Sequence, residues 1–388
     1  MNYDLILLIV FFLLILILFR VYRKKFEVQW GIFALYRTKI GLKFMDKTAK
    51  KYPKFLHYLG YVSIVIGFLG MIITIIFLLK GALTFLTPTP QPQIAPVLPG
   101  INIEGMPNLS FWHWIISILI VATIHEACHG IYSRLIKVKI KSSGFAFLGP
   151  ILAAFVEPDE KQLKKKKTRE QLAVLSAGPF ANILLSIFLI IILALVVMPI
   201  SNKLFEVQGI QISGLNETFP ISKTGITSGD VIEKINDIKI NEIEKLQIIL
   251  SEFNPGDIIT IQTDKGIINV PLGEDINNKT KSALGVIISG YKIIPKEGFT
   301  VLGKVYSWFS LLTLWVFTIS LGVGLFNLLP LGPVDGGKMF YVAALHYTKN
   351  ENKAMKLLKV VSFIILFLII VNMWPFIIQL FRFLSPFS

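Results

Sequence analysis

Two histidines and a glutamate in His125-Glu126-Ala127-Cys128-His129 have the residue types and spacing for metal chemistry. A helix repeats about every 3.6 residues, so His125 and His129 lie one turn apart on one face. Two imidazoles at that spacing can hold one divalent metal ion, and Glu126 lies on the adjacent flank as a candidate general base. Cys128 points away from this face, which favours a packed small residue over a ligand. The pattern predicts a metal-dependent hydrolytic site.

The cluster follows a long apolar run within Phe111–Lys137. Hydrocarbon penalises ionisable side chains, so a His-Glu-His cluster inside a membrane span indicates a functional site. His125 would lie about 21 Å along this helix at about 1.5 Å per residue, in an apolar core about 30 Å thick. Basic residues after the run mark its cytoplasmic end. The site is therefore expected in the cytoplasmic half of the bilayer.

Composition places the chain among multi-pass proteins of the cell membrane. Of its 388 residues 54% are hydrophobic, and the net charge is +15. The basic residues cluster in short loops between apolar runs, which favours a topogenic role and argues against a nucleic-acid partner. A single cysteine excludes an internal disulfide. The expected fold is a polytopic α-helical membrane protein with about six transmembrane helices: Leu5–Phe19, Phe55–Leu79, Phe111–Lys137, Gln171–Ile200, Val301–Leu329 and Val360–Phe383.

The chain divides into four expected parts. Residues 1–110 hold two transmembrane helices, a basic cytoplasmic loop and a proline-rich outer loop. Residues 111–200 and 296–388 form the two halves of a membrane core. Residues 201–295 carry short β-rich runs and turn signals, which predict an inserted soluble domain outside the cytoplasm.

Ser142–Val156 is apolar but too short to span a membrane. Its residues Gly144, Gly149 and Pro150 disfavour a helix. Non-helical backbone at membrane depth is tolerated only where it packs on protein or lines a cavity. A re-entrant β hairpin near the metal is the favoured interpretation, with Phe147 and Gly149 as candidate substrate contacts, and a simple interfacial loop stays open.

Asp335 is the candidate third metal ligand. Catalytic zinc sites use three protein ligands and leave one position for water. Asp335 is the one acid in the proline- and glycine-rich break that ends the fifth apolar run, at a depth that matches the histidines. His113 lies too far up its helix, and the remaining histidines lie near span ends. The combination predicts a zinc site of His125, His129 and Asp335.

From about Phe111 to its end, the chain resembles the site-2 protease family of intramembrane zinc metalloproteases. Residues 125–130, HEACHG, are similar to the family's first motif. Residues 327–336, NLLPLGPVDG, are similar to its second, in which the aspartate is the third ligand of one Zn²⁺ ion. Val334 stands where the family usually has leucine. The resemblance implies regulated intramembrane proteolysis of membrane-protein substrates, whose transmembrane helices would be the partners within the lipid bilayer.

Two asparagines are candidate substrate-binding residues. Asn327 stands where bacterial members of that family hold an asparagine implicated in substrate handling. Asn182 ends a stretch that resembles the family's Gly-x-x-x-Asn motif, Gly178 to Asn182. An asparagine in apolar surroundings needs a partner, so Asn182 serves either a close helix contact or the substrate.

The inserted segment resembles a PDZ domain of the protease type. Residues 225–232, GITSGDVI, and 254–257, NPGD, carry this likeness. Such a domain could bind a peptide or a substrate ectodomain by strand addition, or it could exclude bulky substrates.

Two other function classes are alternatives. A divalent-metal transporter needs acidic residues or histidines in several spans, and the other spans are nearly free of them. A non-catalytic membrane scaffold with a PDZ-like domain would not need Glu126 or a full ligand set.

Overall fold

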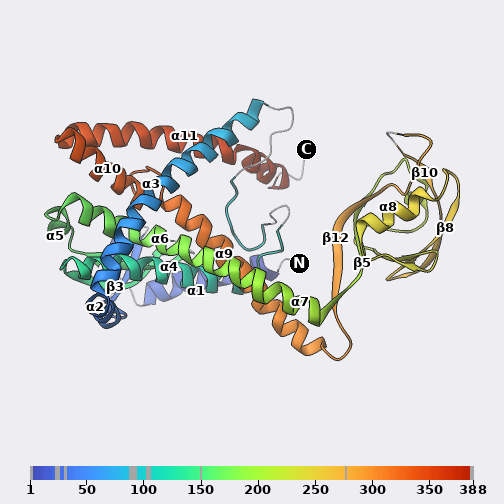
Figure 1. Ribbon diagram of the computed structural model, residues 1–388, viewed down its shortest axis with the longest axis horizontal. Coiled ribbons are helices and arrows are strands. Elements are labelled where there is room, and N and C mark those ends of the chain that lie inside the picture. Colours follow the sequence, from blue (N-terminus) through green and yellow to red (C-terminus); the bar gives the residue numbers. More distant parts are fainter. Residues whose placement is uncertain are drawn as a thin grey trace. The chain divides into compact units, whose positions relative to one another are not determined.

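The computed structural model contains long helices and, among the described residues, three β-sheets, of which one is a two-stranded pair, β10 (Gly273–Glu274) with β11 (Ser282–Ala283) (Figure 1). The chain forms two compact units, Met1–Leu193 with Ser310–Ser388, and Ala194–Phe309. The second unit contains the whole of the predicted insert, residues 201–295. The structure describes residues 3–21, 27–29, 33–86, 94–101, 106–148, 151–275 and 278–384.

Within these described ranges, five helices are long and apolar enough to cross a membrane. They are α3 (Pro53–Leu83), α4 (Phe111–Leu135), the helical stretch Thr168–Leu204, α9 (Thr300–Asn327) and α11 (Glu351–Leu384). Thr168–Leu204 comprises α6 (Thr168–Ile192), a π-helical turn (Leu193–Val197) and α7 (Met198–Leu204). The sixth predicted span corresponds to α1 (Tyr3–Val21), whose apolar part Tyr3–Ile17 is shorter than the other five. Five spans are therefore supported, and the sixth is not.

Helix α3 packs through small residues on one side. Glycine and serine let helix backbones approach closely inside a membrane. Ser63 Oγ lies 2.8 Å from Ser176 Oγ on α6. A Cβ atom at Gly67 would lie 2.7 Å from Met339 Cε, and one at Gly70 would overlap the side chain of Leu328. These contacts hold α3 against α6 and against the chain on both sides of Asp335.

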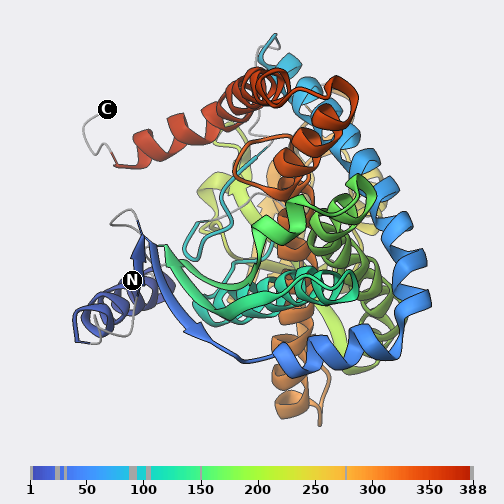
Figure 2. The ribbon, with the colours of Figure 1, turned by 90° about the vertical axis from the view of Figure 1, so that its left-hand side faces the viewer.

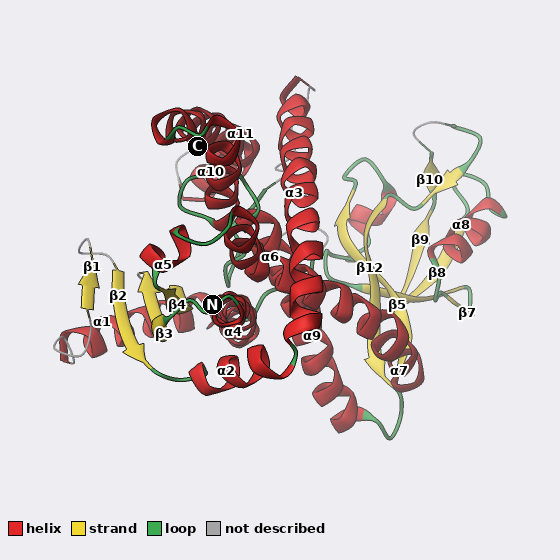
Figure 3. Ribbon diagram, turned by 60° about the vertical axis from the view of Figure 1, so that its left-hand side comes forward, coloured by secondary structure: helices red, strands yellow, loops and turns green. Residues whose placement is uncertain are grey.

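A four-stranded antiparallel sheet belongs to the first unit, with strand order β1-β2-β3-β4 (Figure 3). The strands are β1 (Glu27–Gln29), β2 (Phe33–Thr38), β3 (Ile140–Leu148) and β4 (Ile151–Pro158). The hairpin expected at Ser142–Val156 is present as β3 and β4, which pair from Ile140 with Pro158 to Leu148 with Ile151. Its extension by β1 and β2 was not predicted.

Two features fasten β2 to this hairpin. A Cβ atom at Gly144 would overlap the carbonyl oxygen of Tyr36, so glycine is required where β2 approaches β3. The guanidinium of Arg37 donates to Glu27 at 2.6 Å, to Ser142 at 2.6 Å and to Glu157. One side chain of β2 thus contacts the three other strands.

The second unit holds a six-stranded antiparallel sheet with order β12-β5-β6-β8-β9, and β7 pairs with β6 (Figure 3). Its elements are β5 (Phe205–Leu215), β6 (Val231–Ile235), β7 (Ile238–Lys239), α8 (Ile243–Ser251), β8 (Ile258–Thr263), β9 (Gly266–Pro271) and β12 (Val286–Pro295). Ile210, Ile232 and Ile259 are fully buried, and Leu246 of α8 covers them. Alternating isoleucines on neighbouring strands therefore supply a core separate from that of the helices.

Ion pairs close one turn of this unit. Asp230, 2% exposed, accepts the N–H of Thr227 at 3.0 Å and pairs with Lys265. Burial alone would raise the pKa of Asp230, but the hydrogen bonds from Lys265 and Thr227 outweigh it and hold that pKa below its usual value. Asp230 is therefore ionised at neutral pH and fixes the turn that begins β6.

Candidate active site

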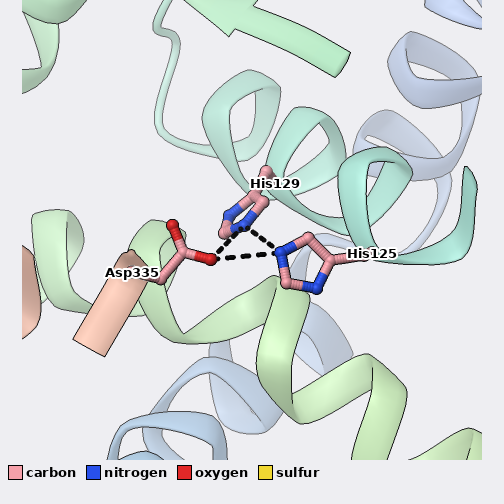
Figure 4. Close-up of side chains that lie close together, drawn as sticks. All are labelled: His125, His129 and Asp335. Atoms are coloured by element: carbon pink, nitrogen blue, oxygen red, sulfur yellow. Dashed lines mark hydrogen bonds and ion pairs between the residues drawn. The ribbon is translucent and has the colours of Figure 1, made fainter. Parts of the chain in front are cut away.

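Three ligating side chains from distant parts of the sequence meet at one point (Figure 4). His125 and His129 come from α4, and Asp335 is the first residue of α10 (Asp335–Thr348). The Nε2 atoms of both histidines lie 3.1 Å from Asp335 Oδ2 and 3.2 Å from each other. Both histidines are buried, with exposed fractions of 6% and 8%. Each of the three residues offers one donor atom, and these atoms lie within 4.8 Å of one another. In the part of the chain that the structure describes, this is the one group of three potential metal ligands.

A tight turn between α9 and α10 brings Asp335 to this point. Helix α9 ends at Asn327, and the chain folds back so that α10 begins eight residues later in sequence. A Cβ atom at Gly336 would overlap the backbone of Leu328, and one at Gly337 would overlap the backbone of Leu331. The two glycines after Asp335 are therefore needed for close backbone contact between the start of α10 and the turn before it.

One face of α6 lines the two imidazoles. Val174, Gly178 and Asn182 follow one another at four-residue intervals and so lie on that face. The Nδ1–H of His129 donates to the carbonyl oxygen of Val174 at 2.7 Å, because a carbonyl can only accept. Asn182 is fully buried, and its Nδ2 lies 3.0 Å from Nδ1 of His125. Both Nδ1 atoms are thus engaged by α6, and both Nε2 atoms point to Asp335.

Gly178 lies directly against the imidazole edges. A Cβ atom at this position would lie 2.7 Å from His125 Nε2 and 2.8 Å from its Cδ2, and would overlap His129 Nε2. No side chain larger than hydrogen fits there without movement of the rings or of α6.

Glu126 is half-buried and faces the hairpin. Its Oε2 accepts the backbone N–H of Val156 on β4 at 2.8 Å. That N–H points away from β3, so Glu126 contacts the outer edge of β4. Val156 was not singled out in the sequence, since nothing local shows which strand edge meets a helix.

Asn327 and Phe147, two other predicted site residues, have hydrogen-bond and strand partners outside the cluster of His125, His129 and Asp335. The amide of Asn327 donates to the carbonyl oxygen of Val323 in its own helix at 3.0 Å. Phe147 pairs through its backbone with Ala34 of β2 and Leu152 of β4. Gly149 lies outside the described residues.

Lys338 was missed in the sequence. Its Nζ lies 4.0 Å from Oδ1 of Asp335, and the side chain is half-exposed. The signal that could have identified it is its position one helical turn after Asp335 in a helix that starts there. Together with Val174 and Asn182, Lys338 gives each of the three ligands a partner for the atom that faces away from the cluster.

This donor set fits zinc. Two imidazole nitrogens and a carboxylate oxygen are ligands that Zn²⁺ accepts, and three protein ligands leave a position for catalysis. Zinc-binding histidines almost always place their other ring nitrogen on a carbonyl, carboxylate or water. His129 does so with Val174, and Asn182 lies at the corresponding place for His125.

Comparison with known proteins finds a family match over most of the segment from α4 to α11. The model of Peptidase family M50 matches residues 113–371. Uncharacterized protein MJ0971 of Methanocaldococcus jannaschii is 31% identical over 318 residues, 79% of this chain and 76% of that protein. Zinc metalloprotease RasP of Oceanobacillus iheyensis is 25% identical over 238 residues, 48% of this chain and 54% of that protein.

Solved structures of PDZ domains resemble a part of this chain that makes up 21% of its length. The PDZ domain of an SdrC-like protein from Listeria monocytogenes is 15% identical and covers 21% of this chain and 87% of that chain, with a TM-score of 0.19. GtR34C from Geobacillus thermodenitrificans is 20% identical and covers 21% of this chain and 95% of that chain, with a TM-score of 0.19.

The family match covers both ligand-bearing segments, residues 125–129 and Asp335. The resemblance to the site-2 proteases that the motifs predicted is confirmed, and a membrane zinc metalloprotease is the class to which the relatives point. The chain therefore belongs to peptidase family M50, the family of the site-2 proteases.

Proposed function

We propose that this protein cleaves peptide bonds within the transmembrane segments of membrane-protein substrates, in regulated intramembrane proteolysis. The observation that carries the proposal is the convergence of His125, His129 and Asp335, with Glu126 one residue from the first ligand. One Zn²⁺ ion is the cofactor that these side chains suit.

The chain's own residues divide the catalytic work. Bound zinc would supply Lewis acidity, which activates the attacking water and polarises the scissile carbonyl. Glu126 takes the proton of the water and passes it to the leaving amine. Among the described contacts, the N–H of Val156 donates to Oε2 of Glu126. The other carboxylate oxygen, Oε1, can therefore accept the proton of the water. The N–H of Val156 thereby orients the base.

The outer edge of β4 is the proposed docking place for an unwound substrate. Carbonyl groups in a helix are hydrogen-bonded, so a transmembrane substrate must become extended before hydrolysis. One edge of β3 is covered by β2 and the other by β4, so among the described residues β4 is the terminal strand on the side of the sheet that Glu126 contacts. Every second residue presents its backbone outward, so Ala154 shares this edge with Val156. Asn327, Phe147 and Gly149 remain candidate substrate contacts.

Membrane sidedness is part of the proposal. Basic residues at the ends of the spans favour an active site in the cytoplasmic half of the bilayer and an inserted domain outside the cytoplasm. That PDZ-like domain would bind a peptide or substrate ectodomain, or filter substrates by size. A transporter is disfavoured because the potential ligands form one group of three and not a series along several spans. A non-catalytic scaffold is disfavoured because Glu126, a candidate general base, follows the first of these ligands directly.

Metal removal tests the proposal. The purified full-length chain is expected to contain one zinc per molecule and to cleave a generic transmembrane substrate. Chelation should abolish cleavage, and added Zn²⁺ should restore it. Asp335→Ala should bind less than about a tenth of the zinc of the wild type, because a ligand is lost. Cleavage that persists without metal, or zinc transport into vesicles without cleavage, would contradict the proposal.

Asn182 is expected to position His125 for zinc. A zinc-bound Nε2 requires the proton on Nδ1, which then needs an acceptor. The Oδ1 of Asn182 is buried without a hydrogen-bond partner among the described residues. A half-turn of this amide places Oδ1 where Nδ2 now faces Nδ1. Asn182→Leu should weaken zinc binding about 10- to 100-fold in competition with a chelating dye, whereas Asn182→Asp keeps an acceptor and should remain close to wild type.

Asn372→Leu is the matched control for Asn182. Asn372 is also buried, at 1% exposed, and donates to the carbonyl oxygens of Leu78 and Leu368. Its replacement should lower thermal stability but leave zinc affinity unchanged. Equal zinc loss in Asn182→Leu and Asn182→Asp would show that the acceptor is not what matters.

A further inference from the structure

Helix α2 (Leu42–Lys51) is amphipathic and lies directly before α3. Figure 2 shows α2 turning into the long α3. Its residues Met45 and Ala49 are buried in a cluster with Ile131 and Tyr132 of α4. The packed face of α2 is thus occupied by the helix that carries the histidine ligands.

The other face of α2 is basic and open to solvent. Its side chains line an open groove of about 570 Å³, formed by Lys43, Asp46, Lys47, Lys50 and Lys51. Asp46 Oδ1 lies 2.9 Å from Nε of Arg134, so the charge of this carboxylate is already offset. Among the described residues, no salt bridge engages the four lysines of the groove. The groove therefore carries a local excess of positive charge.

The level of this groove in the membrane follows from the position of α2 in the sequence. Helix α3 begins at Pro53, two residues after α2 ends, and is a candidate membrane span. The residues immediately before an apolar span lie at the level of the lipid headgroups. Tyr52, Phe55 and Tyr58 are exposed at the same end of α3, as expected for an aromatic belt.

We propose that the α2 groove is a binding site for the phosphate-bearing headgroup of an anionic phospholipid. Four ammonium groups on one face of α2 match an anionic phosphate. The headgroup depth selects a lipid over a free anion, and basic residues next to a span attract acidic lipids. The proposal depends on the membrane location of α3 and not on the proteolytic activity.

The site has a mechanical connection to the metal ligands. A Cβ atom at Gly130, the residue after His129, would overlap Sδ of Met45 on α2. Arg134, one turn further along α4, holds Asp46. A headgroup that fixes α2 in the interface would therefore also support the last turns of α4.

Lipid retention by the full-length chain tests this site. Native mass spectrometry would count dioleoyl-phosphatidylglycerol and dioleoyl-phosphatidylcholine molecules retained from mixed micelles. The wild type is expected to retain phosphatidylglycerol preferentially. The variant K43Q/K47Q/K50Q/K51Q should bind it on the order of tenfold more weakly, since each lysine near an anionic surface contributes measurably. K47Q/K50Q, which keeps more of the native surface, should show a smaller loss in the same direction.

A second lysine group provides the matched control. Lys164, Lys165, Lys166 and Lys167 also form a four-lysine run in the first unit, but they do not line this groove. These lysines directly precede the candidate span Thr168–Leu204, so K164Q/K165Q/K166Q/K167Q removes charge at headgroup level without changing the groove, and it should lose less phosphatidylglycerol than the groove variant does. Equal losses of phosphatidylglycerol in both quadruple variants would show that general surface charge, and not a defined site on α2, retains the lipid. Displacement of the lipid by millimolar inorganic phosphate would identify a free-anion site and overturn the lipid assignment, as would equal retention of both lipids by the wild type.

Discussion

Glu126→Gln is expected to abolish peptide hydrolysis while the protein keeps its zinc. Glu126 is not one of the three side chains that converge on the metal site, so the ligand set stays complete. Glutamine retains an oxygen that accepts the N–H of Val156, which preserves the contact with β4. What it loses is the ability to take up a proton, a contribution of about 10²–10⁴-fold in rate.

The measurement is single-turnover cleavage of a transmembrane substrate, with zinc determined on the same sample. Glu160→Gln is the matched control, because Glu160 is an exposed acid at the start of α5 (Glu160–Lys164), shortly after the hairpin. This control should cleave at the wild-type rate. Turnover by Glu126→Gln within about tenfold of the wild type would remove Glu126 from the role of base.

The convergence of the three candidate metal ligands was predictable because metal-site chemistry leaves few alternatives. Histidines and acids are rare in apolar spans, so His125, His129 and Asp335 stood out by type and depth. The hairpin was also predictable, because Gly144 and a short apolar run exclude a spanning helix. The hairpin is indicated by residues that are neighbours in sequence. The ligands are indicated by the free-energy penalty that hydrocarbon imposes on each ionisable residue independently of its neighbours.

Features that depend on distant pairing were not predictable. Strand β2 joins β3 across more than one hundred residues, and its own sequence reads as part of a basic loop. Helix α10 starts at Asp335 itself, although the prolines and glycines before it favour an irregular turn. The chain is helical from Asp335 to Thr348. The engagement of each imidazole by α6 likewise requires the packing of two helices. Sequence periodicity marks a buried face but does not identify what covers it.

Gly178→Ala is expected to disable the metal site although alanine is the better helix former. The substitution should favour an isolated helix by about 1 kcal/mol. In the folded protein, however, the added methyl group would lie 2.7 Å from His125 Nε2 and overlap His129 Nε2. The rings cannot withdraw freely, because Asn182 and Val174 hold their Nδ1 atoms. Either the imidazoles leave their common point with Asp335 or α6 moves away from α4, and a shift of about 1 Å at a catalytic centre can cost about 100-fold in rate.

Zinc affinity and cleavage rate, measured together, separate this effect from a general loss of folding. Gly322→Ala in α9 is the matched control: it makes the same exchange in a helix of the membrane core, and its added Cβ would meet no heavy atom within 4 Å. That variant should match the wild type in zinc content and in rate, with equal or higher thermal stability. Gly178→Ala should instead lose zinc on dialysis at least about tenfold faster, because the three donor atoms no longer converge. A Gly178→Ala protein that retains zinc and cleaves normally would mean that α6 does not press on the histidines, and with it the account of how this helix orients the ligands would fail.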